Sequence, residues 1–335
     1  MFESKDLQTA CVDPFPRLLG DIGGTNARFG WQSSLQSEVG NVQVLPCAEY
    51  DSLKSAVESY LKQQGLTVPP CASFGIACPV TGDTVTMTNH HWRFSIAELR
   101  VALGLKRLLF VNDFTALALS IPTLPESALH PVGGGVADPT AAIGLIGPGT
   151  GLGVSGLLPG NHPDSWIPVC GEGGHATLAA TTADEFAVIS QLQKRYGHVS
   201  AERVLCGAGL VDLYHALGDV SGGHGHEVTV PAHVLSRAQD QSDARAIRTL
   251  DMFCAFLGTT AGDLALTLGA RGGIYIGGGI VPRLGESFER SAFRDRFEQK
   301  GRYKSYLKQV PTMVIHSLVS PALQGASRAL SINLS

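Results

Sequence analysis

Two segments of the chain share one strand–turn–strand pattern. RLLGDIGGTNARFGW covers residues 17–31, and IGLIGPGTGLGVSGLL covers residues 143–158. In each segment an apolar run meets a glycine-rich turn and a second run follows, which predicts two antiparallel strands joined by a tight turn. Because the pattern occurs twice, with Gly20 aligned on Gly147, we expect two related α/β halves that each present a glycine-rich turn to the cleft between them.

The size and composition of the chain favour a two-domain enzyme for small molecules. A chain of 335 residues exceeds one ordinary domain of about 150 residues. Apolar residues make up 44% and charged residues 16%, with 40 glycines, which is typical of a well-buried α/β enzyme rich in tight turns. The net charge of -4 offers no basic surface for a phosphate polymer, so we expect no nucleic-acid partner.

The cysteines and the first residues indicate where such a protein works. The chain has seven cysteines and no C-x-x-C pair, which argues against a disulfide framework and against a zinc knuckle. Residues 1–17 carry acidic groups and lack an apolar core of signal-peptide length. We therefore expect a cytoplasmic protein that is not membrane-bound.

The first glycine-rich turn is a candidate phosphate site. Phosphate oxygens need several convergent N–H donors, and Gly23, Gly24 and Thr25 let backbone amides point inward. A structural hairpin turn explains a single such motif equally well. The second copy at residues 149–151 favours phosphate binding, and the run of Gly277, Gly278 and Gly279 after an apolar stretch suggests a third ligand loop.

Two other glycine motifs are excluded. G-x-G-x-x-G occurs at residues 151–156, but VSGLLPG follows it, and no helix can start there. A dinucleotide site needs a strand, a loop and then a helix, so we reject a dehydrogenase. A Walker A loop is excluded because the sequence contains no Gly-Lys pair.

Two aspartates at strand ends are candidates for the chemistry. Asp21 ends the first strand, where it could hold Mg²⁺ directly or through water, or simply cap the turn. Asp113 follows a buried strand that runs to Val111, and a helix begins after it. Transfer of a phosphoryl group to an alcohol needs a carboxylate that orients the hydroxyl and takes its proton, and Asp113 is our candidate. The alternative role of Asp113 is an N-cap.

A third group of polar residues suits a sugar. Glu172 and His175 stand three apart in a glycine-rich bend, and Glu202 follows Ser200 in the first turn of a predicted helix. Glu202 could instead complement the helix dipole, and His175 could simply pack. Sugar hydroxyls both give and take hydrogen bonds, so mixed acceptors and donors, including Asn112, favour a sugar pocket.

Three further expectations concern local structure. A long helix is predicted over residues 244–270, and a hairpin is predicted around residues 81–83. The SGGHGHE stretch at 221–227 is read as a solvated surface loop in preference to a metal site.

Nine blocks of sequence resemble one known family. They are GDIGGTNAR, GIACPVTGD, MTNHHW, FSIAEL, NDFTALALSIP, GPGTGLGV, GEGGH, GHVSAERVL and GGIYIGGGIVPR. In this order, from about Leu18 to about Leu330, they resemble the bacterial ATP-dependent glucokinases of the non-ROK group, within the hexokinase and actin-like ATPase superfamily. The sequence departs from the family's pattern in its N-terminal extension, in the SGGHGHE loop and at Cys206, where serine is usual.

The resemblance implies an activity and assigns residues to it. It implies transfer of the γ-phosphate of ATP to the 6-hydroxyl of glucose, the first step of glycolysis, with Mg²⁺ travelling with the nucleotide. Glucose would be held by Asn112, Asp113, Glu172, His175 and Glu202, with Asp113 as base. The nucleotide would be held by Gly20, Asp21, Ile22, Gly23, Gly24, Thr25, Asn26, Thr150, Gly151, Gly277, Gly278 and Gly279.

The resemblance also implies an architecture. The family fold is a smaller α/β domain, here about residues 1–122 with about 315–335 (1–16 being an extension), beside a larger α/β domain over about 123–314. Homodimers are usual in such relatives. A kinase for another hexose or donor, and an actin-like nucleotide-dependent regulator without sugar chemistry, remain the alternatives.

Overall fold

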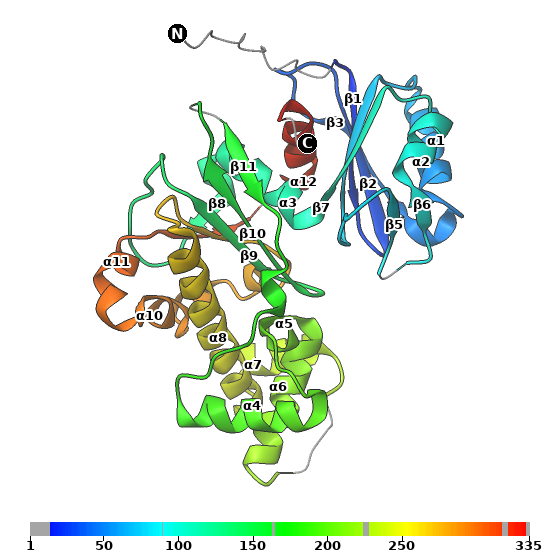
Figure 1. Cartoon of the computed structure of the whole chain (residues 1–335). Coiled ribbons are helices and arrows are strands. Elements are labelled where there is room, and N and C mark those ends of the chain that lie inside the picture. Colours follow the sequence, from blue (N-terminus) through cyan, green and yellow to red (C-terminus); the bar gives the residue numbers. More distant parts are fainter. Residues whose placement is uncertain (1–13, 89, 163–164, 224–227, 317–320, 333–335) are drawn as a thin grey trace, which may run out of the picture. The chain divides into compact units, whose positions relative to one another are not determined.

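The chain forms two compact α/β units, each with its own sheet. The computed structural model describes residues 14–88, 90–162, 165–223, 228–316 and 321–332 (Figure 1). The first unit holds the described residues within 1–124, 160–168 and 317–335, and the second holds those within 125–159 and 169–316. The domain limits expected near residues 122 and 315 stay a prediction.

The first unit is built on a five-stranded sheet. Its strand order is β3-β2-β1-β4-β7, where β1 is antiparallel to β2 and parallel to β4, and β4 is parallel to β7. The strands are β1 (Arg17–Ile22), β2 (Asn26–Gln32), β3 (Gly40–Pro46), β4 (Cys71–Ile76) and β7 (Arg107–Asn112). Every residue of β4 is buried, as expected for a central strand of a sheet that is covered on both faces.

Helices cover both faces of this sheet, as Figure 1 shows. One face carries α1 (Leu53–Gln64) and α2 (Ile96–Ala102), and the other carries α3 (Asp113–Ser120) and α12 (Pro321–Ser331). A small sheet pairs β5 (Thr84–Thr86) with β6 (Arg93–Ser95). The hairpin expected around residues 81–83 is therefore wrong, because the strand that follows it pairs forward, with residues 93–95, across a longer loop.

The C-terminal helix α12 is locked onto this unit by two close contacts. A Cβ added to Gly325 would overlap the carbonyl oxygen of Ala116 at 1.6 Å, so only glycine lets α12 approach α3 this closely. The fully buried Arg17 donates hydrogen bonds from Nη1 to Ser327 O at 2.9 Å and to Ser331 Oγ at 3.0 Å. The start of β1 and helix α12 are thus held together.

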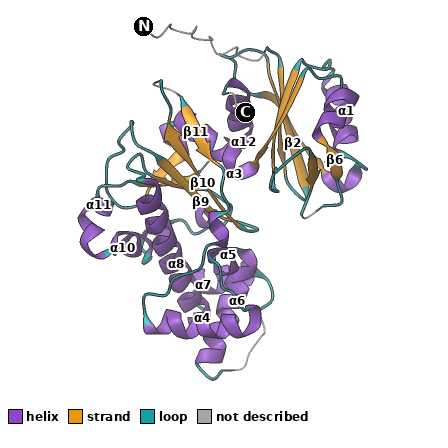
Figure 2. Cartoon of the chain, viewed as in Figure 1, coloured by secondary structure: helices purple, strands orange, loops and turns teal. Residues whose placement is uncertain are grey.

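The other sheet has six strands in the order β11-β10-β9-β12-β13-β8, and all of them except β11 lie wholly within the second unit. The strands are β8 (Leu129–Pro131), β9 (Ile143–Pro148), β10 (Leu152–Pro159), β11 (Trp166–Val169), β12 (Ile274–Ile276) and β13 (Thr312–Ile315). The helices are α4 (Ala183–Tyr196), α5 (Ala201–Val204), α6 (Gly207–Val220), α7 (Pro231–Gln239), α8 (Ala244–Leu268), α9 (Glu286–Glu289), α10 (Phe293–Glu298) and α11 (Lys304–Lys308). Figure 2 shows α8 running from the sheet into the group formed by α4, α6 and α7.

Helix α8 confirms the long helix expected from the spacing of apolar residues. The Asp243 side chain caps its start by accepting hydrogen bonds from Arg245 N at 2.8 Å and Ala246 N at 3.2 Å. Gly269 ends it with φ of 62°, a left-handed conformation that favours glycine. Between these caps α8 is buried on most sides and forms the centre of the second unit's core.

Both strand–turn–strand segments are confirmed. Antiparallel pairing joins β1 to β2 around the turn at residues 23–25, and β9 to β10 around the turn at residues 149–151. Within the described ranges, no helix has the length and apolar character needed to cross a membrane.

Candidate active site

The carboxyl ends of three neighbouring parallel strands bring the first turn and Asp113 to one edge of a sheet. Ile22 on β1, Ile76 on β4 and Asn112 on β7 lie in register. Gly75 lies one position before this row, and a Cβ there would be 3.6 Å from the Cα of Asp113 and 3.8 Å from Gly20 O. Open α/β sheets bind their ligands at this edge.

Asn112 is the N-cap of helix α3, a role that was equally expected of Asp113. The Oδ1 atom of Asn112 accepts hydrogen bonds from Phe114 N at 2.9 Å and Thr115 N at 3.3 Å. Asp113 is the first helical residue, and its Oδ1 also accepts from Phe114 N at 2.9 Å. The carboxylate of Asp113 is therefore held in a defined orientation at the helix start, where the N-terminal dipole favours a negative charge.

The negative charge of Asp113 influences the pKa of the Cys78 thiol. Burial raises the pKa of Cys78, and the negative charge of Asp113 raises it further. Cys78 comes two residues after the end of β4, so the charge of Asp113 acts on the loop that leaves the central strand.

The first turn uses one of its own N–H groups to close. Gly23 N donates a hydrogen bond to Asn26 O at 2.9 Å, and Cys47 N donates to Thr25 O at 2.8 Å. Cys47 Sγ donates to Gly23 O at 3.4 Å. The amide of Gly23 thus serves the turn itself, and the N–H groups of Gly24 and Thr25 are the ones to consider as phosphate donors.

The carboxylate of Asp21 pairs with Arg28. The two residues face each other across β1 and β2, and Arg28 Nη1 lies 3.0 Å from Asp21 Oδ2. The turn-capping role considered for Asp21 stays an alternative to metal binding. Arg28 was not among the predicted site residues. Its position opposite Asp21 in a short hairpin could have indicated a cross-strand ion pair.

The turn at residues 149–151 is also closed by a backbone hydrogen bond of its own. Gly149 N donates to Gly151 O at 2.8 Å, and Gly207 N, at the start of α6, donates to Gly149 O at 2.9 Å. The N–H groups of Thr150 and Gly151 remain as candidate phosphate donors. The Sγ atom of Cys206 caps α6 by accepting from Gly209 N at 3.3 Å, which is the capping role that serine would serve.

Glu202 lies against this second turn. It lies in the first turn of α5, as expected, and Ser200 caps this helix. Glu202 Oε2 accepts a hydrogen bond from Leu152 N at 3.0 Å, and a Cβ added to Gly151 would be 2.5 Å from the same oxygen. A side chain at 151 would therefore displace the carboxylate.

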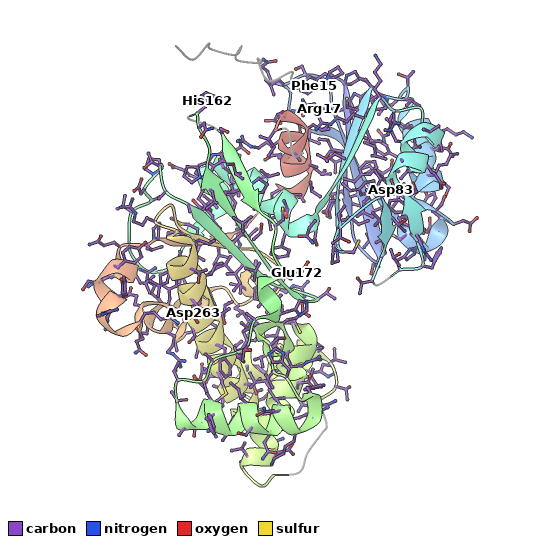
Figure 3. All side chains as sticks on the ribbon, in the orientation of Figure 1. Phe15, Arg17, Asp83, His162, Glu172 and Asp263 are labelled. Carbon is purple, nitrogen blue, oxygen red and sulfur yellow. The ribbon has the colours of Figure 1, made fainter. Side chains whose placement is uncertain are left out.

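A short 3-10 turn at residues 173–175 lies next to Glu202; it ends at His175, and Glu172 directly precedes it. His175 Nδ1 is 3.8 Å from Glu202 Oε1, and the His175 side chain is 60% exposed, so the packing role considered for it is wrong. Glu172, labelled in Figure 3, precedes this turn and is exposed, and its carbonyl accepts from His175 N at 3.0 Å. The turn rests on β10, since a Cβ at Gly174 would be 2.2 Å from Leu152 O.

The glycine run at residues 277–279 packs against the end of β9 and the turn at residues 149–151. Gly277 N donates to Ile146 O at 2.9 Å, at the end of β9. Gly278 has φ of 77°, and a Cβ there would be 2.2 Å from Pro148 O. Residues 277–279 and 149–151 therefore form one continuous surface of backbone.

The structure thus gathers the predicted residues in two groups, one on each unit. Gly20 to Asn26, Asn112 and Asp113 belong to the first unit, and Thr150, Gly151, Glu172, His175, Glu202 and residues 277–279 belong to the second. A recess of about 430 Å³ on α4 and α6, lined by Arg195, Asp212 and His215 among others, contains none of them. Most of the SGGHGHE loop, residues 224–227, and most of the N-terminal extension, residues 1–13, lie outside the described residues.

Comparison with known proteins identifies the family. The Glucokinase family model matches residues 18–332. The chain belongs to the glucokinase family. This confirms the resemblance carried by the nine sequence blocks.

Named members of the glucokinase family match nearly the whole chain. The glucokinase of Aromatoleum aromaticum is 50% identical, with 97% of each chain covered. The "Bifunctional protein glk" of Paraburkholderia xenovorans is 48% identical over 96% of this chain, which spans 49% of that longer relative. A crystal structure of glucokinase from an Antarctic psychrotroph, 35% identical, has a TM-score of 0.86 and covers 95% of this chain and 99% of its own. This likeness confirms the predicted α/β fold of the actin-like ATPase type.

Proposed function

We propose that the protein is a cytoplasmic glucokinase that transfers the γ-phosphate of ATP to the 6-hydroxyl of glucose, the first step of glycolysis. Its membership of the glucokinase family supports this activity. The single observation that supports the mechanism is that Asn112 is the N-cap of α3 and Asp113 is its first helical residue, so the alternative of Asp113 as N-cap does not apply.

Asp113 is the base in this proposal. Its carboxylate orients the 6-hydroxyl of glucose and takes the proton as the oxygen attacks phosphorus. The Oδ1 atom of Asn112 is engaged by the helix cap, so its amide NH₂ is the end that donates to a sugar hydroxyl. Glu172, His175 and Glu202 complete the sugar set with acceptors and a donor.

The glycine turns hold the nucleotide. The N–H groups of Gly24, Thr25, Thr150 and Gly151 donate to phosphate oxygens, and residues 277–279 line the adenosine. Closure of the site around glucose excludes water, which is a competing acceptor. By family analogy the protein works as a homodimer.

Magnesium fits this site through Asp21. No cluster of three or more potential metal-ligating side chains occurs among the described residues, so an ion would take most of its ligands from phosphates and water. The Asp21 carboxylate, oriented by Arg28, is suited to accept hydrogen bonds from such waters. When bound, Mg²⁺ neutralises charge on the phosphates.

Asp113→Asn tests the proposed base. We expect glucose binding to persist and turnover to fall by about 10²- to 10⁴-fold, the usual loss on removing a general base. Asp83→Asn is a matched control, because Asp83 only caps α2 through Ser95 and Ala97 and should leave turnover unchanged. Near-normal turnover of Asp113→Asn would exclude the role.

A panel of sugars and phosphate donors tests the substrate. With ATP as donor, sugar-phosphate formation from glucose is expected to exceed that from other hexoses. With glucose as acceptor, formation of glucose 6-phosphate from ATP is expected to exceed that from ADP or polyphosphate. ATP hydrolysis measured with and without glucose separates a kinase from a nucleotide-dependent regulator, which would not respond to the sugar.

A further inference from the structure

The carboxylate of Glu202 touches both halves of the second unit's candidate site. Its Oε2 atom accepts from Leu152 N at 3.0 Å, directly after the turn at residues 149–151. Its Oε1 atom faces His175 Nδ1 at 3.8 Å. A backbone N–H bonded to a carboxylate makes a charge-assisted hydrogen bond, which is stronger than one between neutral groups.

Close packing surrounds the Oε2 atom of this carboxylate and the residue that it contacts. Gly151 supplies the space for Oε2, since any Cβ at that residue would be 2.5 Å away. Gly174 approaches Leu152 O so closely that a Cβ there would be 2.2 Å away. The backbone of Leu152 therefore contacts both Glu202 and the turn that carries His175.

The gap between Glu202 and His175 fits one hydroxyl group. Two polar atoms 3.8 Å apart can both lie about 2.8 Å from a single oxygen placed between them. A hydroxyl can donate to the carboxylate and accept from the imidazole in that position. A carboxylate has about four acceptor sites, so Glu202 can hold the hydroxyl and Leu152 N together.

We propose that Glu202 couples the two substrates, a role that rests on the proposed function. A sugar hydroxyl bound between Glu202 and His175 restrains the same carboxylate that anchors the phosphate turn. The turn is then ordered before the nucleotide arrives, so glucose tightens ATP binding. By reciprocity, ATP tightens glucose binding by the same factor.

Amide hydrogen exchange tests the anchor in the protein without substrates. In Glu202→Ala we expect exchange of the Leu152 amide to accelerate by at least about tenfold, because a hydrogen bond to a charged group is lost. Glu202→Gln keeps an acceptor oxygen and should stay within about threefold of wild type. Glu286→Ala is the matched control, since Glu286 lies in an exposed ion pair with Arg290 on α9 and its substitution should leave this amide unchanged.

Titration with a non-hydrolysable ATP analogue tests the coupling. Saturating glucose should lower the Kd of the analogue at least about fivefold in wild type and in Glu286→Ala, and less than twofold in Glu202→Ala. The inference would be overturned if the Leu152 amide in Glu202→Ala exchanged at the wild-type rate. It would also be overturned if glucose lowered the Kd of the analogue in that variant as much as in wild type. Failure of the wild-type protein to bind glucose and the analogue would instead refute the proposed function, and the exchange result would be unaffected.

Discussion

Arg28 donates a hydrogen bond of 3.0 Å to the carboxylate of Asp21, and the two residues lie directly opposite each other on β1 and β2. Both side chains are partly exposed, so the pair contributes little to stability. Its effect is to hold one carboxylate beside the turn at residues 23–25.

Asp21→Asn should therefore affect the metal more than the fold. We expect the Mg²⁺ concentration for half-maximal rate to rise about 10- to 100-fold, as for other residues that orient a metal site. Thermal unfolding should stay within a few degrees of wild type. An unchanged Mg²⁺ requirement would remove Asp21 from the metal site.

Gly278→Ala should destabilise the second unit. The left-handed backbone at Gly278 costs an alanine about 1–2 kcal/mol, and its Cβ would overlap Pro148 O. We expect a loss of at least about 2 kcal/mol in urea unfolding and a raised KM for ATP. Gly279→Ala is the control: no described atom lies within 4 Å of a Cβ built there, so its unfolding should change by less than about 0.5 kcal/mol.

The buried pair of Glu185 and Arg296 should make stability depend on pH. Glu185 is 2% exposed, and it accepts from Arg296 Nη2 at 3.1 Å and from Thr181 N at 2.7 Å. Burial raises the pKa of Glu185, but the bonds from Arg296 and Thr181 outweigh it, so the pKa lies below its ordinary value. A lowered folded-state pKa gives stability that is present above the unfolded pKa and is lost as pH falls through the folded pKa.

Arg296→Met should accordingly cost about 3–5 kcal/mol at pH 7, because it leaves a buried carboxylate unpaired. The difference from wild type should shrink as pH approaches 4, where the unpaired carboxyl becomes protonated. Denaturant titrations between pH 7.5 and 4 measure this. Arg290→Met, in an exposed pair with Glu286, should change stability too little to detect at any pH, and a pH-independent loss in Arg296→Met would contradict the interpretation.

Cysteine reactivity should follow burial. Burial raises the pKa of Cys254 to about 12, whereas Cys170 is exposed. Because the thiolate is the reactive form, iodoacetamide at pH 8 should label Cys254 at least about 100-fold more slowly than Cys170 in the native protein. Peptide mass spectrometry measures both rates, and equal rates in the native state would show that Cys254 is accessible. In guanidinium chloride the difference should disappear.

Much of the local structure was predictable because its signals lie within a few residues. Apolar runs around glycines identified both strand pairs, and the spacing of apolar residues identified α8. The start of a helix after Ser200 was predicted correctly, since capping depends on the next three residues. The hairpin at residues 81–83 failed because strand pairing there spans a longer loop than the turn signal indicated.

The sequence by itself determined which residues have the chemistry for phosphate and sugar, and in which strand or turn each lies. Only the tertiary structure decided how they are used: that Asn112 rather than Asp113 caps α3, that Arg28 holds Asp21, and that Glu202 reaches Leu152. The physical reason is that residue type and periodicity act over a few neighbouring positions. A contact between residues 152 and 202 depends instead on how the whole unit packs, and that packing requires small residues such as Gly151 at the point of contact.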